Sequence, residues 1–145
     1  MVLRKADAQT ESGIFPPNTT ELFGAMGAYM QEMTDAGILR AGEGLQPSSK
    51  GARVKFRNGK PTVIDGPFTE AKELIAGYSI IEVRSLQEAI DWTKKWPASD
   101  AEGNVEIEIR RIYEAEDFGD MFTPEQRVAE EKMRAKAAEA SKIAN

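Results

Sequence analysis

The order of strand-like and helix-like segments constrains the fold of this chain more than any single motif does. Apolar residues recur at helical spacing between Asn18 and Gly37 and again between Ser85 and Trp96. Short alternating segments flank both helices, and a hairpin joins the two strand–helix–strand units. This order predicts an α+β, ferredoxin-like antiparallel sheet with both helices on one face.

Both predicted helices carry signals at their ends. Asn18 and Ser85 are each followed three residues later by a glutamate, a spacing typical of a capping box. Gly37 suits the end of the first helix, and Trp96-Pro97 ends the second. We therefore expect two amphipathic helices with definite boundaries.

The predicted hairpin has one basic face. Apolar and basic residues alternate over residues 52–57, Asn58-Gly59 follows, and an apolar segment returns over residues 62–64. Asn-Gly between two alternating segments is the strongest short-range hairpin signal. We expect the basic face to be solvated rather than to bind an anion, because Lys and Arg seldom bury without partners.

Charge and hydropathy exclude two kinds of partner. The chain has 145 residues and a formal net charge of -5, which gives it no electrostatic reason to bind nucleic acid. No segment reaches the roughly 18 consecutive apolar residues of a membrane-spanning helix, and the N-terminus lacks a signal-peptide pattern. We expect a cytoplasmic protein that binds neither nucleic acid nor membrane.

The absence of two residue types restricts the chemistry further. The sequence contains no Cys, which excludes disulfides and thiolate nucleophiles, and no His, the commonest general base and metal ligand. No phosphate-binding loop, dinucleotide fingerprint or metal-ligand cluster is present. We therefore expect no cofactor and no metal.

Length and pattern indicate one domain over residues 1–118 and a helical tail over residues 119–145. Thr123, Pro124 and Gln126 predict the start of the tail helix. Its apolar stripe is too thin to found a core, so the tail packs on its own body, packs on a partner, or frays.

The predicted sheet has more apolar surface than two helices can cover. Residues 105–109 alternate clearly, but the alternation slips by one residue at Arg110–Ile112, through a bulge or a change of covered face. An exposed apolar sheet face of several hundred Å² is not tolerated on a soluble monomer, a rough guide from surveys of protein surfaces. We therefore expect at least a homodimer that pairs the sheet faces opposite the helices.

Two carboxylates are the candidate catalytic residues. Asp65 ends an apolar, buried-looking strand, and a carboxylate held in an apolar pocket can transfer protons near neutral pH. Glu43 lies between two glycines, where the backbone can approach another group closely. In the alternative interpretation, Asp65 accepts backbone N–H groups from the turn at residues 66–68 and has only a structural role.

Four further residues are candidate ligand-binding groups. Tyr78 could orient a carbonyl or hydroxyl of a small molecule, and Phe68 follows the Asp-Gly-Pro turn as a core or pocket residue. Lys72 and Glu73 form a solvated turn or pair with Glu43 or Asp65 to order the site.

Several of these features together resemble the YCII-related family, in its DGPF-domain branch, over about Met1 to Tyr113. The features are Glu43 in Ala-Gly-Glu-Gly-Leu-Gln-Pro, the Asn58-Gly59 hairpin, Asp65-Gly66-Pro67-Phe68 with Glu70, Lys72 and Glu73, and Gly77-Tyr78. The resemblance implies a dimeric α/β barrel, in which two ferredoxin-like sheets face each other and a pocket lies between sheet and helices.

Two classes of function stay open. Some relatives in this family are thought to be enzymes that use a His and Asp pair, but this chain has no His, so catalysis would depend on carboxylates, Tyr or Lys. One hypothesis is therefore an isomerase, lyase or hydrolase acting on an unknown small molecule through Asp65 with Glu43. The other is a non-catalytic ligand-sensing or regulatory module, since other relatives occur beside or fused to transcription-initiation sigma factors.

Overall fold

The computed structural model of the chain describes residues 1–70 and 73–143. They form two compact units, Met1–Arg111 and Ile112–Asn145, which are described separately.

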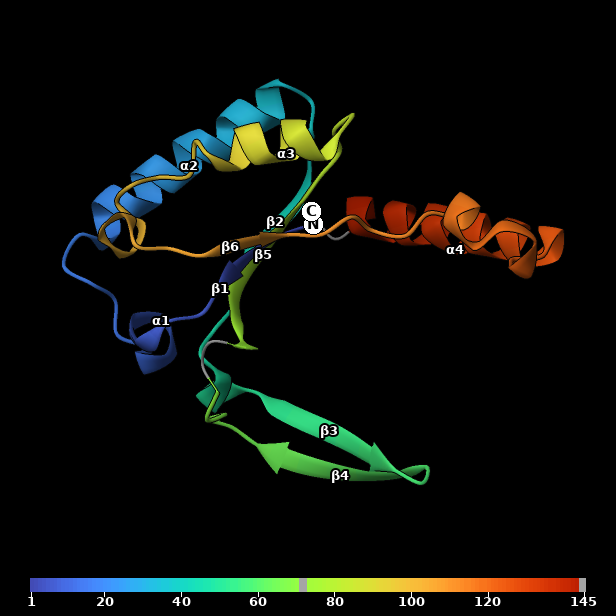
Figure 1. The fold of residues 1–145 in the computed structure, drawn as a ribbon, viewed down its shortest axis with the longest axis horizontal. Helices are drawn as coiled ribbons and strands as arrows, with labels where there is room; N and C mark the ends of the chain where they lie inside the picture. The colour runs from blue at the N-terminus through green and yellow to red at the C-terminus, as the bar shows by residue number, and fades with distance from the viewer. Residues whose placement is uncertain (71–72, 144–145) are drawn as a thin grey trace. The chain divides into compact units, whose positions relative to one another are not determined.

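The first unit is built on a four-stranded antiparallel sheet with strand order β2-β5-β1-β6 (Figure 1). Its strands are β1 (Val2–Lys5), β2 (Leu39–Gly44), β5 (Ile75–Ile81) and β6 (Ile107–Ile109). All three strand pairs are antiparallel, and β1 is central. This is the strand order of a ferredoxin-like fold, so the α+β prediction is confirmed.

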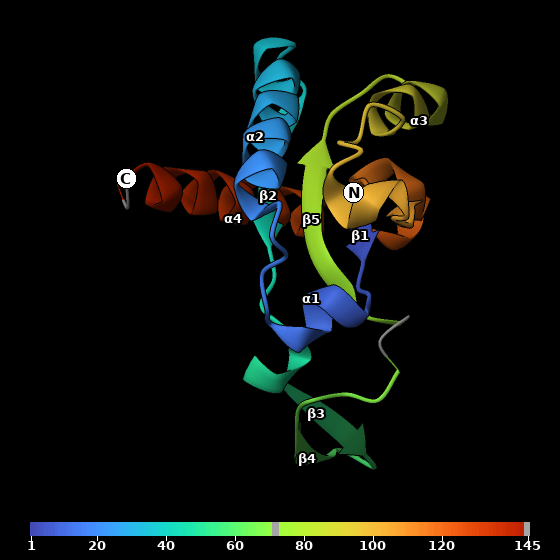
Figure 2. The ribbon, with the colours of Figure 1, turned by 90° about the vertical axis from the view of Figure 1, so that its left-hand side faces the viewer.

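Two helices, α2 (Thr19–Asp35) and α3 (Leu86–Thr93), cover one face of this sheet (Figures 1 and 2). Tyr29 and Met33 of α2 and Ala89 of α3 are buried there, together with Val2 of β1. Met30 of the same helix lies over Gly42 of β2, since a Cβ on Gly42 would stand only 2.5 Å from the Met30 Cε. We call the face that α2 and α3 leave uncovered the open face.

The helix ends differ in part from the prediction. Asn18 does precede α2, but its side chain makes no cap hydrogen bond, and its Nδ2 donates instead to the Ser99 carbonyl oxygen at 3.0 Å. The predicted capping box there is wrong because a residue distant in sequence takes the amide. At α3 the Ser85 Oγ accepts from the Glu88 N–H at 3.1 Å, as predicted, but the Glu88 carboxylate accepts from the Arg84 N–H.

A short helix, α1 (Ala8–Ser12), was not predicted. Asp7 caps it, because the Asp7 Oδ1 accepts from the Thr10 N–H at 2.8 Å while the Thr10 Oγ1 accepts from the Asp7 N–H at 2.9 Å. The chain therefore turns away from the sheet immediately after β1.

The hairpin, β3 (Ala52–Arg57) and β4 (Lys60–Asp65), forms a separate two-stranded sheet. Asn58 and Gly59 turn it with φ values of 50° and 76°, as the Asn-Gly signal predicts. Every residue of both strands is exposed. The expectation that the strand before Asp65 is buried is thus wrong for the single chain, because among the described strands β4 pairs with β3 alone and all its residues are exposed.

The last strand ends at Ile109, where its alternation breaks, but begins at Ile107 and not at Val105. After Ile109, the Arg110 N–H donates to the Met1 carbonyl oxygen at 2.8 Å, and the Met1 ammonium donates back to the Arg110 carbonyl oxygen at 2.7 Å. The slip at Arg110–Ile112 therefore marks the end of β6 and of the first unit, rather than a bulge.

The second unit contains a 3₁₀ segment, η4 (Ala115–Met121), and the helix α4 (Pro124–Ile143). The predicted start of α4 is confirmed, and Thr123 and Gln126 form a capping box there: the Thr123 N–H donates to Gln126 Oε1 at 2.9 Å and the Gln126 N–H donates to Thr123 Oγ1 at 3.3 Å. No described helix in either unit is long and apolar enough to span a bilayer.

Candidate functional site

Four residues lie in register across the open face of the sheet, one on each strand. Glu43 of β2 is opposite Tyr78 of β5, Tyr78 is opposite Leu3 of β1, and Leu3 is opposite Glu108 of β6. We call these four residues the cross-sheet row.

Side-chain alternation places the cross-sheet row on the open face. Val2 and Arg4 are buried on the helix-covered side, so Leu3 between them faces the other way. Ser79 is buried opposite Val2, which puts the neighbouring Tyr78 on the side of Leu3. Two residues predicted from sequence, Glu43 and Tyr78, are thus brought together.

The row places carboxylates at both ends of an apolar and aromatic centre. Glu43 is exposed on the edge strand, while Tyr78 and Leu3 are half-buried. At the other end the Glu108 carboxylate pairs with the Lys5 ammonium at 3.8 Å, and Lys5 also lies on the open face. Sequence reasoning missed Leu3, Lys5 and Glu108, because only the strand order puts them beside Tyr78.

Asp65 lies apart from this row. It is the last residue of β4, opposite Ala52 of the hairpin, and it is exposed. The turn that follows does not donate to it, since the Gly66 N–H donates to the Gly51 carbonyl oxygen at 3.0 Å and the Phe68 N–H to Ser48 Oγ at 3.0 Å. The alternative interpretation, in which Asp65 accepts the turn N–H groups, is therefore wrong.

The turn after Asp65 fastens the base of the hairpin. A Cβ on Gly66 would lie 1.8 Å from the Ser48 carbonyl oxygen, so only glycine fits there. Ser48 is held in turn by Glu11 of α1, whose carboxylate accepts from the Ser48 N–H at 3.2 Å and from its hydroxyl. The Asp-Gly-Pro-Phe block thus joins the hairpin to α1 through Ser48.

The other predicted ligand-binding residues are dispersed. Phe68 is half-buried, with the Arg53 guanidinium 4.1 Å from its ring centroid. Glu73 is exposed, and its N–H donates to the Glu70 carbonyl oxygen at 3.0 Å. Lys72 lies outside the described residues. Within residues 1–70 and 73–143, no hydrogen bond or ion pair joins Asp65, Phe68 or Glu73 to Glu43 or Tyr78.

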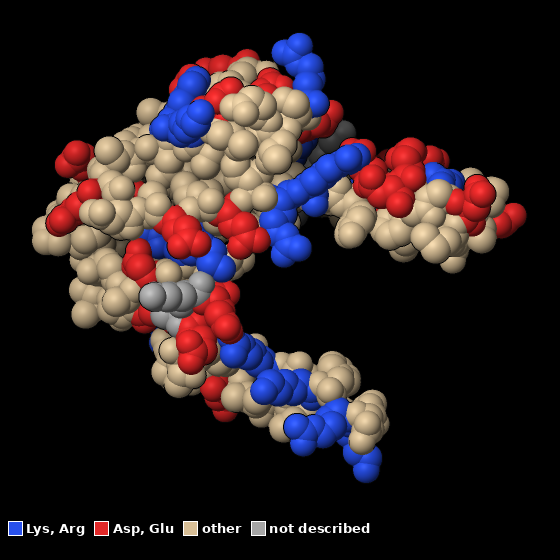
Figure 3. All heavy atoms as spheres, viewed as in Figure 1, with Lys and Arg blue, Asp and Glu red and all other residues tan. Residues whose placement is uncertain are grey.

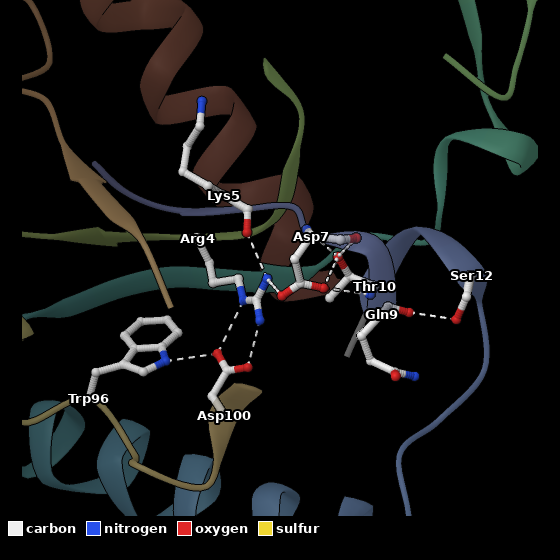
Figure 4. Close-up of polar contacts among 8 residues, drawn as sticks. All are labelled: Arg4, Lys5, Asp7, Gln9, Thr10, Ser12, Trp96 and Asp100. Atoms are coloured by element: carbon white, nitrogen blue, oxygen red, sulfur yellow. Dashed lines mark hydrogen bonds and ion pairs between the residues drawn. The ribbon is translucent and has the colours of Figure 1, made fainter. Parts of the chain in front are cut away.

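The most buried polar cluster of the first unit lies on the helix-covered side (Figure 4). Arg4 donates from Nε to Asp100 Oδ2 at 3.1 Å and from its NH2 nitrogen to Oδ1 at 2.7 Å, and the Trp96 indole donates to the same carboxylate at 2.9 Å. The third guanidinium nitrogen lies 2.8 Å from the Asp7 carboxylate and donates to the Lys5 carbonyl oxygen at 2.6 Å. All three charged groups are satisfied by one another, so the cluster holds β1, α1 and the segment after α3 together.

Electrostatics in this cluster favour the charged states. Burial alone would lower the pKa of Arg4, but hydrogen bonds and charge from Asp100 and Asp7 outweigh it and raise that pKa. Burial would raise the pKa of Asp7, yet the Thr10 N–H and Arg4 lower it overall. Sequence reasoning missed this cluster because Arg4 and Asp100 are 96 residues apart.

Two hollows of the described surface lie beside Trp92, and none of the predicted site residues lines them. One is lined by Ser85, Gln87, Glu88, Asp91, Trp92 and Lys95, and the other by Ala36, Ile38, Glu82, Val83, Arg84, Glu88 and Trp92. Both are open to solvent, and the Lys95 ammonium lies 3.9 Å from the Trp92 ring centroid. The described residues hold no group of three or more His, Cys, Asp or Glu arranged for a metal ion.

Comparison with known proteins gives two matches. Residues 1–116 match the model of a family described as the YCII-related domain. The chain is also similar to the curated "Uncharacterized protein R00369" of Rhizobium meliloti (strain 1021), with 30% identity over 89 residues. That alignment covers 61% of this chain and 72% of that protein.

Proposed function

The chain belongs to the YCII-related family, and from this premise we propose that it binds a small organic molecule on the open face of its sheet, as a homodimer. The Asp65–Phe68 block supports placing it in the DGPF-domain branch.

The observation that carries the proposal is the register pair Glu43–Tyr78 on the open face. Side chains directly opposite in an antiparallel pair have Cβ atoms about 4.5–5.5 Å apart, so one ligand can contact both. The carboxylate accepts hydrogen bonds and the phenol donates one. This combination suits a small molecule that offers an amine or hydroxyl to Glu43 and a carbonyl or carboxylate oxygen to Tyr78.

A second copy of the chain would complete this site. The open face carries apolar side chains between its charged ends, including Leu3, Ala41 and Ile80, and only a partner sheet or the rest of the chain can remove them from water. Face-to-face packing of two such sheets about a two-fold axis would exclude solvent around Glu43 and Tyr78. Ligand sites are commonly such apolar spaces with a few polar groups.

Ligand binding is a better-supported function than catalysis by an Asp65–Glu43 pair. A catalytic pair must reach one substrate, whereas Asp65 ends the separate hairpin sheet and Glu43 lies in the main sheet. A regulatory or ligand-sensing role needs only the Glu43–Tyr78 pair. An isomerase, lyase or hydrolase is the second candidate, with Glu43 as the proton acceptor and Tyr78 as the donor to a carbonyl.

The test is a thermal-shift screen of small amino, hydroxy and keto acids against wild type, Glu43→Gln and Tyr78→Phe. Glu21→Gln is the matched control, because Glu21 is also an exposed glutamate but lies on α2. A ligand that binds only the folded state raises the melting temperature. We expect at least tenfold weaker binding in both site variants and no change in the control.

Two results would count against the proposal. The ligand site fails if a compound stabilises wild type and both site variants equally. The assembly fails if light scattering at about 10 μM, well above the dissociation constants of stable homodimers, finds only the 16.0 kDa monomer.

A further inference from the structure

The hairpin has two chemically distinct faces, because residues directly opposite on its two strands share a face. The apolar face is made of Ala52, Val54, Phe56, Pro61 and Val63, beside Asp65 at its base. The basic face is made of Arg53, Lys55, Arg57 and Lys60, with Thr62 and Ile64. Figure 3 shows the Lys and Arg side chains in blue along the hairpin.

The apolar face of the hairpin is exposed to an unusual degree. The exposed fractions are 54% for Val54, 72% for Phe56 and 64% for Val63. A two-stranded hairpin by itself is only marginally stable in water. We therefore expect another surface to cover this apolar face and stabilise the hairpin.

The hairpin is nevertheless firmly held at its base. Gly66 packs on the Ser48 carbonyl and donates to the Gly51 carbonyl oxygen, and Phe68 donates to Ser48 Oγ. Two views agree that the hairpin extends from the sheet on the side away from α2 and α3, which is the side of the open face (Figures 1 and 2). The hairpin therefore extends towards the position that a second copy packed on the open face would occupy.

Charge favours a second copy of this chain as the occupant. Residues 52–65 hold four Lys or Arg and one Asp, a net charge of +3, and the whole chain carries -5, so the remaining residues carry -8. Of this -8, residues 112–145 carry -3, so the rest of the first unit carries -5, and a hairpin of +3 is attracted to that unit of another copy. A polyanion such as nucleic acid would be repelled by that same unit.

We infer that the hairpin is a docking arm for a second copy of this chain. Its apolar face packs at the rim of the partner subunit's open face, beside Glu43 of the partner subunit, while its Lys and Arg residues, on the opposite face, attract the acidic partner at longer range. By two-fold symmetry each subunit gives one arm and receives one. The inference rests on the dimer proposed above, and it adds that each ligand site is bordered by the arm of the other subunit.

The first test measures the dimer dissociation constant by sedimentation equilibrium for two arm variants. Phe56→Thr with Val63→Thr removes apolar contact but keeps residues that favour strands, and Lys55→Glu with Arg57→Glu reverses the charge. Phe23→Thr is the control, because Phe23 is 59% exposed on α2. We expect the dimer dissociation constant to increase at least tenfold in each arm variant and to stay unchanged in the control. Circular dichroism must show that each variant is folded.

The second test is disulfide cross-linking. The sequence contains no Cys, so any disulfide that forms must join two introduced cysteines. A tagged Phe56→Cys protein is mixed with an untagged Glu43→Cys protein and oxidised. We expect a cross-linked heterodimer, and none when Phe23→Cys replaces Glu43→Cys.

The outcomes separate the two proposals. If wild type is a dimer but the arm variants have the same dissociation constant and the cross-link does not form, the docking-arm inference is wrong. The sheet-face dimer is then unaffected. A wild-type monomer at about 10 μM would remove both, because stable homodimers persist at that concentration. Tight, salt-sensitive binding of a DNA duplex that the charge-reversal variant loses, with an unchanged dimer, would also overturn the arm.

Discussion

Gly66 and Ser48 are in contact at the base of the hairpin, and the space between them has no room for a side chain. A Cβ built on Gly66 would lie 1.8 Å from the Ser48 carbonyl oxygen and 3.2 Å from the Ser49 nitrogen. Both neighbours are backbone atoms, which cannot rotate aside as a flexible side chain can. The glycine of the Asp-Gly-Pro-Phe block is therefore required by packing.

We predict that Gly66→Ala lowers the free energy of unfolding by about 1–3 kcal/mol, the usual cost of overpacking a close contact. Gly24→Ala is the matched control, because a Cβ at Gly24 meets nothing within 4 Å and Gly24 lies inside α2. Alanine is favoured over glycine in a helix, so the control should be neutral or stabilising by up to about 1 kcal/mol. Urea denaturation of the two variants measures the difference, and equal effects would refute this account of Gly66.

The buried pair Arg4–Asp100 leads to a second prediction. Arg4→Met removes two hydrogen bonds from the Asp100 carboxylate and leaves it buried with the Trp96 indole. Breaking one side of a buried pair typically costs about 3–5 kcal/mol. Arg40→Met is the control, because the Arg40–Glu82 pair has the same kind of contact at 2.8 Å on the surface.

Exposed ion pairs contribute at most about 1 kcal/mol, so the control should change the urea midpoint little. A loss in Arg4→Met no larger than that in Arg40→Met would show that the buried cluster does not hold β1, α1 and the segment after α3 together.

Tyr29 predicts a stability change at alkaline pH. Burial, and then the nearby Glu32 charge, raise the pKa of Tyr29 from 10.0 to about 12. Between these two values the unfolded chain loses the phenol proton and the folded chain keeps it. The stabilisation is thus fully present below pH 10 and is lost as the pH rises through about 12.

The measurement is urea unfolding of wild type and Tyr29→Phe at several pH values from 8 to about 11.5, the window set by that raised pKa. Other groups titrate in the same range, so the difference between the two proteins isolates Tyr29. We expect Tyr29→Phe to be less stable by about 1 kcal/mol below pH 10 from loss of its 3.1 Å hydrogen bond to the Trp92 carbonyl oxygen. The gap should narrow or reverse as the pH rises, and a constant gap would refute the assignment.

Features decided by neighbouring residues could be predicted from the sequence. The Asn58-Gly59 turn and the cap formed by Thr123 and Gln126 both follow from local backbone and hydrogen-bonding preferences, and both are confirmed. The order of strands and helices likewise predicted the sheet, because period-2 and period-3.6 patterns differ clearly over these lengths.

Features decided by distant residues could not be predicted. The Asn18 amide binds Ser99 instead of capping α2, and Arg4 binds Asp100, over separations of 81 and 96 residues. The exposure of β4 also escaped prediction, because the apolar content of a strand does not tell which surface covers it. Glu43 and Tyr78 were each singled out, yet their pairing depends on the β2–β5 register, which no local pattern encodes.

The hairpin enters and leaves the main sheet at neighbouring points. The Leu45 N–H donates to the Ala76 carbonyl oxygen at 2.8 Å, so β2 and β5 are already joined where the chain departs towards β3 and where it returns. None of the main-sheet ladders uses a residue of the hairpin. The arm is thus a module that evolution can lengthen, recharge or delete without disturbing the ladder, which leaves the choice of partner free to diverge while the fold stays constant.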